Sequence, residues 1–479
     1  MPERPNLLYM HSDQHSPAVL GCGGDPLVQT PHLDGLAAQG VHFDHVYCPS
    51  PVCVASRMAM LAGRYPHETE CWTNHDMLDS AVPTLAHAMG AGGYRPVLIG
   101  RMHARGPDQL HGYAERLVGD HSGNYSSGAA PGLALSYLRN AGSGQSSYQV
   151  HDEDVAAASI DFFNRLGVRR RAGLDDGPFS LSVGFMLPHL PFVARREDYE
   201  LYRDKITPPR HAQPFSDELH PFIRWWRQRA GWHDATEEEM LNARAAYWAL
   251  VSRLDLLIGQ ILQALRHNGL EENTLVIYTS DHGEQVGEHG LWSKRTFYER
   301  SVKVPAIVSW PGHLPEGVRC ERVLSSLDLN TTMLAALQCP PLPHARGRDA
   351  LGIFQDHDAA WKDLAFSEYC LDEGHYHRMV RRDEWKLNYY HGQEPQLFDL
   401  RADPDELRDR ARDPACAAVR EALEREVLDG WDPERIARRM VRRRADRALI
   451  DQWAKAVRPE DQYRWERKKE MDYLDEVQP

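Results

Sequence analysis

Two pairs of polar residues in this 479-residue sequence have the chemistry of divalent-cation ligands. Asp13 and Gln14 follow the apolar residues 6–10, and Asp281 and His282 follow a second apolar run. Because ligands bind open α/β sheets at the carboxyl ends of strands, two such ends would supply oxygen and nitrogen ligands to one ion. Taken alone, either pair also fits a helix cap, which is the commoner role of an Asp after a strand.

A cysteine and an arginine one helical turn apart have the chemistry of an activated nucleophile. Cys53 opens a predicted helix, and Arg57 follows it. The backbone N–H groups at a helix N-terminus and a guanidinium both create positive potential, which stabilises a thiolate. On this fragment alone, a buried structural cysteine beside a surface arginine remains the alternative.

The elements that must position these residues alternate between strand-like and helix-like patterns. Continuous apolar runs separated by helices are typical of a mostly parallel sheet that helices cover on both faces. We therefore expect residues 1–360 to form one α/β domain around a large, mixed but mostly parallel sheet. The expected strands are residues 6–10, 95–99, 179–186, 275–279 and 304–310, and the expected helices are residues 33–39, 55–63, 84–90, 154–166 and 237–267.

The pattern changes after residue 360. Residues 361–413 contain short, closely spaced, half-polar runs, which predict a small antiparallel sheet. Residues 414–479 are charged and helical in pattern, with an arginine cluster at 435–444. This tail is either a solvated helix or an arm that packs on a neighbouring copy, and through it we expect a homo-oligomer, a dimer or tetramer.

Composition excludes several classes of protein. The formal net charge of −14 argues against a nucleic-acid partner. The mean hydropathy is −0.56, and we see no apolar run near the ~20 residues of a spanning helix, so no membrane partner is expected. The first residues lack the pattern of a secretory signal, which predicts a cytoplasmic protein in which most of the eight cysteines are free thiols.

The sequence C-V-A-S-R at residues 53–57, with Leu61, Gly63 and Arg64, resembles the signature of type I sulfatases of the alkaline-phosphatase-like superfamily. The resemblance extends over almost the whole chain, beginning with residues 6–14, which resemble the first metal-binding strand. Further ordered matches are T-P-H-L-D at 30–34, G-R-M-H at 100–103, P-H-L-P-F at 188–192, D-H-G-E at 281–284 and G-E-H-G-L-W-S-K at 287–294.

The resemblance implies that the protein hydrolyses a sulfate monoester to an alcohol and inorganic sulfate. It implies one divalent cation, with Ca²⁺ favoured over Mn²⁺ and Mg²⁺, and conversion of Cys53 to formylglycine (3-oxoalanine), on which a covalent sulfo-enzyme forms. His189 would protonate the leaving alcohol, and His103 would act as a base. The implied metal ligands are Asp13, Gln14, Cys53, Asp281 and His282; the catalytic residues are Cys53, Arg57, His103 and His189; and the substrate-binding residues are Asn74, Arg101 and Lys294.

The Asp13-Gln14 pair and the charged tail resemble most the branch that holds choline sulfatases and phosphonate monoester hydrolases. Two residues depart from the family pattern: Ala55 stands where proline is usual, and Arg101 stands where lysine is normal, which replaces a point charge by a planar fork. Two alternatives stay open. One is a phosphonate monoester or phosphodiester hydrolase that uses the same site, and the other is a non-catalytic oxyanion binder with an unmodified Cys53.

Overall fold

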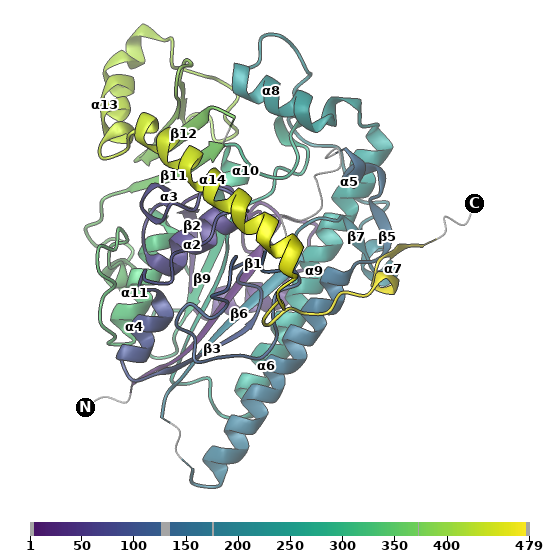
Figure 1. The fold of residues 1–479 in the computed structure, drawn as a ribbon, viewed down its shortest axis with the longest axis vertical. Coiled ribbons are helices and arrows are strands. Elements are labelled where there is room, and N and C mark those ends of the chain that lie inside the picture. The colour runs from purple at the N-terminus through teal and green to yellow at the C-terminus, as the bar shows by residue number, and fades with distance from the viewer. Residues whose placement is uncertain (1–3, 126–134, 175–176, 372, 476–479) are drawn as a thin grey trace.

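The computed structural model describes residues 4–125, 135–174, 177–371 and 373–475. Its largest sheet has eight strands in the order β10-β2-β9-β8-β1-β6-β3-β4 (Figure 1). Only β9 runs antiparallel to its two neighbours, whereas the other adjacent pairs in this sheet are parallel, so the predicted mixed, mostly parallel sheet is confirmed. The strands are β1 (Asn6–Asp13), β2 (Val41–Tyr47), β3 (Arg95–Gly100), β4 (Glu115–Arg116), β6 (Phe179–Pro188), β8 (Thr274–Ser280), β9 (Lys303–Ser309) and β10 (Val318–Ser325).

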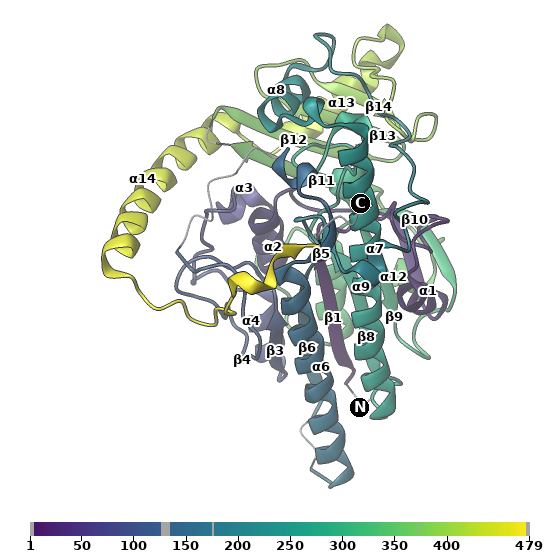
Figure 2. The same cartoon turned by 90° about the vertical axis from the view of Figure 1, so that its right-hand side faces the viewer.

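Helices cover both faces of this sheet. On one face α6 (Ser147–Arg171) and α1 (Pro31–Ala38) both pack against α9 (Glu237–His267) (Figure 2). On the other, α2 (Cys53–Ala62), α4 (Leu85–Ala91) and α11 (Ser326–Ala336) contact one another. Every residue of β1, β6 and β8 is buried, which explains why these strands are continuous apolar runs.

Two features differ from the sequence expectation. Strands β2 and β10 lie at one side of the sheet, and polar residues interrupt both, so neither stands out as an apolar run. Among the described residues, α9 is long and apolar enough to cross a membrane, although no such run was expected. Because 78% of its apolar window is buried in the protein, α9 has the burial of a core helix.

A second, four-stranded sheet follows in the chain. Its strands are β11 (Leu364–Leu371), β12 (His375–Arg382), β13 (Trp385–Tyr390) and β14 (Gln396–Asp399), each antiparallel to the next, as predicted. Helix α13 (Ala417–Leu428) packs on β12 and β13, and α14 (Pro433–Val457) begins the predicted helical tail.

The tail returns to the N-terminal half of the chain. Figure 2 shows α14 arching away from the sheet before the chain turns back. Arg443 and Arg447 of α14 pair with Glu70 and Asp76 at 3.2 and 3.1 Å. Beyond α14, β15 (Tyr473–Leu474) pairs with β5 (Gly142–Gln145), which also pairs with β7 (Val193–Ala194). Part of the arginine cluster is therefore paired within its own chain.

The remaining elements are short helices in the connections. They are α3 (Pro66–Thr69), α5 (Ser136–Arg139), α7 (Arg196–Tyr199), α8 (Pro221–Ala230), α10 (Glu299–Val302), α12 (Leu351–Gln355), and the 3₁₀ turns η1 (Trp232–Asp234), η2 (Glu288–Gly290), η3 (Pro414–Cys416) and η4 (Lys469–Met471).

Candidate active site

The carboxyl ends of two parallel strands bring the predicted metal ligands together. Asp13 is the last residue of β1, and Asp281 follows β8, the strand that pairs with β1 in parallel. Cys53 approaches from the first position of α2. One ligand atom each of Asp13, Cys53, Asp281 and His282 lies within 4.8 Å of the others, and all four residues are buried.

Each carboxylate of this cluster divides its oxygens between an arginine and the centre. Asp281 Oδ2 accepts a hydrogen bond from Arg57 Nε at 2.8 Å, and Asp13 Oδ2 accepts one from Arg101 Nε at 2.5 Å. The other oxygens, Asp13 Oδ1 and Asp281 Oδ1, lie 3.7 and 3.6 Å from His282 Nε2. Two inward carboxylate oxygens and an imidazole nitrogen form a donor set that fits a divalent cation.

His282 is in the protonation state that a metal ligand needs. Its Nδ1 donates to the carbonyl oxygen of Gly283 at 3.1 Å, which leaves the lone pair on Nε2. Burial lowers the pKa of His282 to about 4, so the ring is neutral at pH 7. A neutral imidazole with a free Nε2 can coordinate without first releasing a proton.

Cys53 points into the cluster, as predicted. Its Sγ lies 3.2 Å from both His282 Nε2 and Lys294 Nζ, and 3.7 Å from Asp13 Oδ1. The start of α2 is fixed by Asn74, whose Oδ1 accepts a hydrogen bond from the Val54 backbone N–H at 3.1 Å. A side-chain oxygen at position 53 would therefore point to the same centre as the inward oxygens of Asp13 and Asp281.

Positive charge is concentrated at the cluster. Three buried cations, Arg57, Arg101 and Lys294, surround the two carboxylates. Burial opposes ionisation of Asp13, but Arg101 and the other nearby cationic groups hold the pKa of Asp13 well below its usual value. Any bound divalent cation would add positive charge here, which suits a site for an oxyanion.

Arg101 reaches the cluster because two glycines let β3 and β6 approach closely. Gly100, at the end of β3, has a φ of +88°, and a Cβ on Gly184 would lie 1.8 Å from the carbonyl oxygen of Arg101. Besides Asp13, the Arg101 guanidinium contacts Asp120 Oδ1 at 3.3 Å and His103 Nδ1 at 2.8 Å. The planar fork thus joins three side chains.

Asp120 is a buried site residue that the sequence analysis missed. Its Oδ2 accepts a hydrogen bond from the His103 backbone N–H at 2.7 Å, while Oδ1 accepts from Arg101. Burial opposes ionisation, but Arg101 and His103 hold the pKa of Asp120 far below its usual value. Asp120 therefore holds both residues that carry the G-R-M-H segment into the site.

The contacts of His103 make it a hydrogen-bond donor. An arginine can only donate, so His103 Nδ1 must accept from Arg101, and the neutral ring carries its proton on Nε2. Burial and Arg101 keep the pKa of His103 well below 6.5, so the ring is neutral. A neutral ring in this tautomer offers an N–H at Nε2, which differs from the base that the family resemblance implies.

His189 has the opposite tautomer. Its Nδ1 donates to the carbonyl oxygen of Leu190 at 2.6 Å, so the neutral ring has its lone pair on Nε2, 3.9 Å from Asp13 Oδ1. Burial and the Lys294 charge lower the pKa of His189. The Tyr148 ring lies beside it, with centroids 5.8 Å apart. Nε2 of His189 can therefore exchange a proton with a group bound at the cluster.

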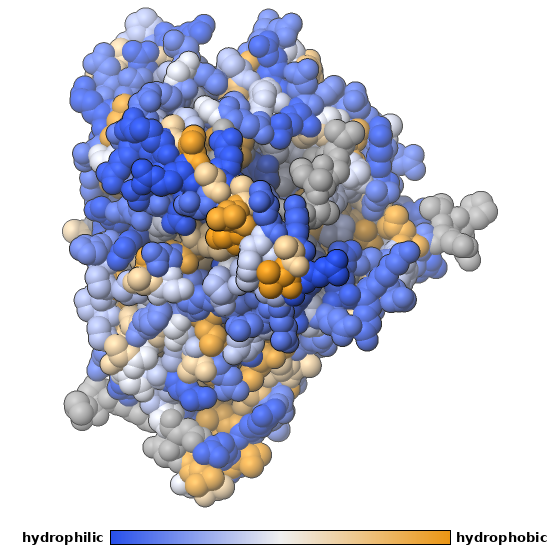
Figure 3. Space-filling view, viewed as in Figure 1, coloured by the Kyte–Doolittle hydropathy of each residue, from blue (hydrophilic) through white to orange (hydrophobic). Residues whose placement is uncertain are grey.

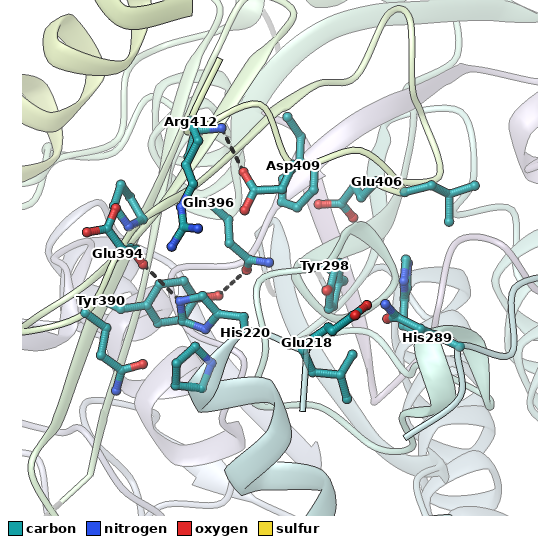
Figure 4. A pocket seen from close by; sticks show the side chains of 18 of the residues that line it. Glu218, His220, His289, Tyr298, Tyr390, Glu394, Gln396, Glu406, Asp409 and Arg412 are labelled. Atoms are coloured by element: carbon teal, nitrogen blue, oxygen red, sulfur yellow. Dashed lines mark hydrogen bonds between the residues drawn. The ribbon is translucent and has the colours of Figure 1, made fainter. Parts of the chain in front are cut away.

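A separate cavity of about 1220 Å³ lies between the loop at residues 210–221 and the C-terminal sheet (Figure 4). Tyr298, which flanks a matched family segment, lines this cavity and stacks on His289 with centroids 4.1 Å apart. Among the described residues that line the cavity, Cys53 and the predicted metal ligands are not found. The cavity is thus distinct from the cluster.

Comparisons with known proteins agree with this geometry. The Sulfatase family profile matches residues 5–339, and the profile "N-sulphoglucosamine sulphohydrolase, C-terminal" matches residues 287–431. The choline-sulfatase of Rhizobium meliloti (strain 1021) is 31% identical over 431 residues, 86% of this chain and 83% of that protein. Arylsulfatase K of Bos taurus is 30% identical over 440 residues, 85% of this chain and 78% of that protein. The crystal structure of the phosphonate monoester hydrolase of Agrobacterium radiobacter superimposes with a TM-score of 0.74 at 25% identity, covering 89% of this chain and 95% of that chain.

Proposed function

The chain belongs to the sulfatase family, and on that premise we propose that the Asp13–Cys53–Asp281–His282 cluster hydrolyses a sulfate monoester to an alcohol and inorganic sulfate. The observation that carries the proposal is the pairing of this ligand cluster with three buried cations, Arg57, Arg101 and Lys294. A sulfate monoester is a poor electrophile, because its anionic oxygens repel a nucleophile. Positive charge on those oxygens is therefore what catalysis requires.

We propose that Asp13, Gln14, Asp281 and His282 hold one divalent cation together with the side chain at position 53. The cation would withdraw charge from the sulfate oxygens and lower the pKa of a hydroxyl bound to it. The three oxygen donors of Asp13, Gln14 and Asp281 and the nitrogen donor of His282 favour Ca²⁺, although Mn²⁺ and Mg²⁺ accept the same atoms. Arg57 and Arg101 fix the two carboxylates so that one oxygen of each faces the ion.

We also propose that Cys53 is converted to formylglycine, whose hydrated aldehyde would supply the nucleophilic hydroxyl. Position 53 supports this because its side-chain atom already lies 3.2 Å from Lys294 Nζ and His282 Nε2. Mass spectrometry of the peptide that spans residue 53 tests the conversion, since the aldehyde is lighter than the thiol. A purified protein that releases sulfate while it carries only the thiol would contradict the proposal.

His189 and His103 divide the proton handling in this proposal. Protonated His189 donates from Nε2 to the leaving alkoxide, because Nδ1 is committed to the Leu190 carbonyl. Once neutral, the same Nε2 can accept a proton from the second hydroxyl at position 53. His103 donates its Nε2–H to bound substrate, because Arg101 occupies Nδ1.

The second candidate is phosphonate monoester or phosphodiester hydrolysis at the same cluster. It is favoured by the structural likeness to the phosphonate monoester hydrolase of Agrobacterium radiobacter. A panel of nitrophenyl sulfate, a nitrophenyl phosphate diester and a nitrophenyl phosphonate ester, ranked by kcat/KM, separates the two. The sulfate must rank first if sulfate-ester hydrolysis is the main activity. For the alcohol group, choline is one candidate, because the relative in Rhizobium meliloti is a choline-sulfatase.

We further propose a homo-oligomer, in a cytoplasmic protein, in which α14 contacts a second copy. Val441, Leu449, Trp453 and Val457 lie exposed along α14, and Figure 3 shows orange, hydrophobic residues over this helix. Size-exclusion chromatography with light scattering tests this proposal, and a monomer at assay concentration would contradict it.

A further inference from the structure

The backbone of Gln14 is held by hydrogen bonds beside the proposed cation site, where the orientation of its side-chain amide decides which atom faces the cation. The residue is fully buried and has a φ of +69°, in the left-handed region. Its backbone N–H donates to Asp281 Oδ1 at 3.1 Å, and its carbonyl oxygen accepts from the Tyr247 hydroxyl at 2.7 Å. The main chain of Gln14 is therefore held in one conformation. Only the side-chain torsions decide which end of the amide faces the cluster.

The two ends of the Gln14 amide contact groups of opposite character. One end lies against Lys294 Nζ, which can only donate, so that end must be the oxygen Oε1. The other end, Nε2, donates to Glu284 Oε2. Because Lys294 Nζ also lies 3.2 Å from Cys53 Sγ, the oxygen end of Gln14 faces the cluster.

Glu284 is itself held as an acceptor. It is fully buried, and its Oε1 accepts hydrogen bonds from the Val286 and Ser293 backbone N–H groups at 3.0 and 2.5 Å. Backbone N–H groups cannot reverse their role, so the carboxylate cannot rotate without leaving two buried donors unpaired. Its second oxygen is thereby directed at Gln14.

We propose that Glu284 is a positioning residue that sets the Gln14 amide so that Oε1, and not Nε2, faces the cation site. This inference rests on the proposed function, since it concerns the same cation. Partners of this kind, which hold a ligand without touching the metal, orient the ligand and contribute to metal affinity. Glu284 lies in the D-H-G-E segment of the sequence, yet residue types alone give it no role.

The substitution Glu284→Gln tests the proposal with almost no change in shape. The new amide keeps its oxygen on the Val286 and Ser293 N–H groups, so its NH₂ faces Gln14. Gln14 must then turn, which places its own NH₂ towards Lys294 and the cation. We expect Ca²⁺ affinity of the chelator-treated full-length protein, measured by isothermal titration calorimetry, to fall about 10- to 100-fold.

The double variant Gln14→Glu/Glu284→Gln supplies a rescue that a merely structural role would not give. The carboxylate at position 14 accepts from the new amide with one oxygen and offers its other oxygen to the cation. We expect Ca²⁺ affinity to recover to within a few-fold of the wild type or to exceed it. If Glu284→Gln alone does not fold, this double variant, compared with Gln14→Ala, still tests the proposal.

The same loop offers a matched control. Glu288 is a buried carboxylate that accepts from the backbone N–H groups of Arg210 and His211 at 3.0 and 2.8 Å. We expect Glu288→Gln to keep wild-type Ca²⁺ affinity. A folded Glu284→Gln protein that binds Ca²⁺ as tightly as the wild type, or a folded double variant without recovery, would overturn the inference. A wild-type protein that binds no divalent cation would instead overturn the metal site of the proposed function.

Discussion

Replacing Arg101 by lysine keeps the positive charge and removes the fork. The Arg101 guanidinium spans Asp13 at 2.5 Å, His103 Nδ1 at 2.8 Å and Asp120 at 3.3 Å, each through a different nitrogen. A lysine has one nitrogen and can contact one of these groups well. Arg101→Lys therefore leaves Asp120 without its main cation and frees the His103 ring to choose either tautomer.

The expected effect follows from the contacts that are lost. Two charge-assisted hydrogen bonds disappear, and each contributes about 1.5–3 kcal/mol. If their loss is felt in the transition state, kcat/KM falls by about 10²- to 10⁴-fold. The charge that attracts the sulfate remains, so we expect KM to change less than kcat. Initial rates with nitrophenyl sulfate measure both constants.

Two further variants make this prediction specific. Arg95→Lys is the control, because the Arg95 side chain is 73% exposed and contacts only Glu115 across 3.5 Å among the ion pairs of the described residues. Asp120→Asn removes the other partner of the fork, and the double variant with Arg101→Lys must lose less than the sum of the two single losses. A kcat/KM for Arg101→Lys within a few-fold of the wild type, or strict additivity, would refute the reasoning.

Four other outcomes are expected. Cys53→Ala lowers sulfate release by at least about 10³-fold with little change in Tm, and an active variant would exclude position 53 as the nucleophile. Exhaustive chelation abolishes activity and a divalent cation restores it, so activity indifferent to chelation would reject the metal site. His189→Ala slows an alkyl sulfate more than nitrophenyl sulfate, because only the basic alkoxide needs a proton to leave; equal losses would argue against His189 as the acid. Burial lowers the pKa of His289 to about 4, so the unfolded chain takes up its proton first and stability falls as pH drops below about 6.5. Asparagine tolerates the φ of +55° at this position. We expect His289→Asn to remove about 2 kcal/mol of the free energy of unfolding that is lost between pH 7 and pH 5, as measured by urea unfolding. An unchanged pH dependence of the free energy of unfolding in this variant would contradict the prediction.

The sequence predicts those site residues that lie in recognisable segments. Asp13, Cys53, Asp281 and His282 follow strands or open a helix, and the structure brings them within a few ångströms. Apolar runs likewise predict the central strands, because burial on both faces requires them. The antiparallel C-terminal sheet is also predicted, from its closely spaced half-polar runs.

Residues that act through a partner far along the chain leave weaker patterns. Asp120 lies 19 positions after Arg101 in a polar stretch, and only the fold shows that its carboxylate reaches Arg101. The role of His103 also depends on a contact, since its tautomer follows from Arg101. The arginines of α14 indicate charge, but their pairing with Glu70 requires the tail to fold back onto the N-terminal half of the chain.

The path of the last residues has a practical consequence for anyone who handles this protein. The Trp465 backbone N–H donates to the Asp120 carbonyl oxygen at 2.8 Å, and the Asp461 carboxylate accepts from the Asn124 N–H at 2.8 Å. Removing the chain from residue 461 onward would thus take away two contacts to the segment that carries Asp120 and Asn124.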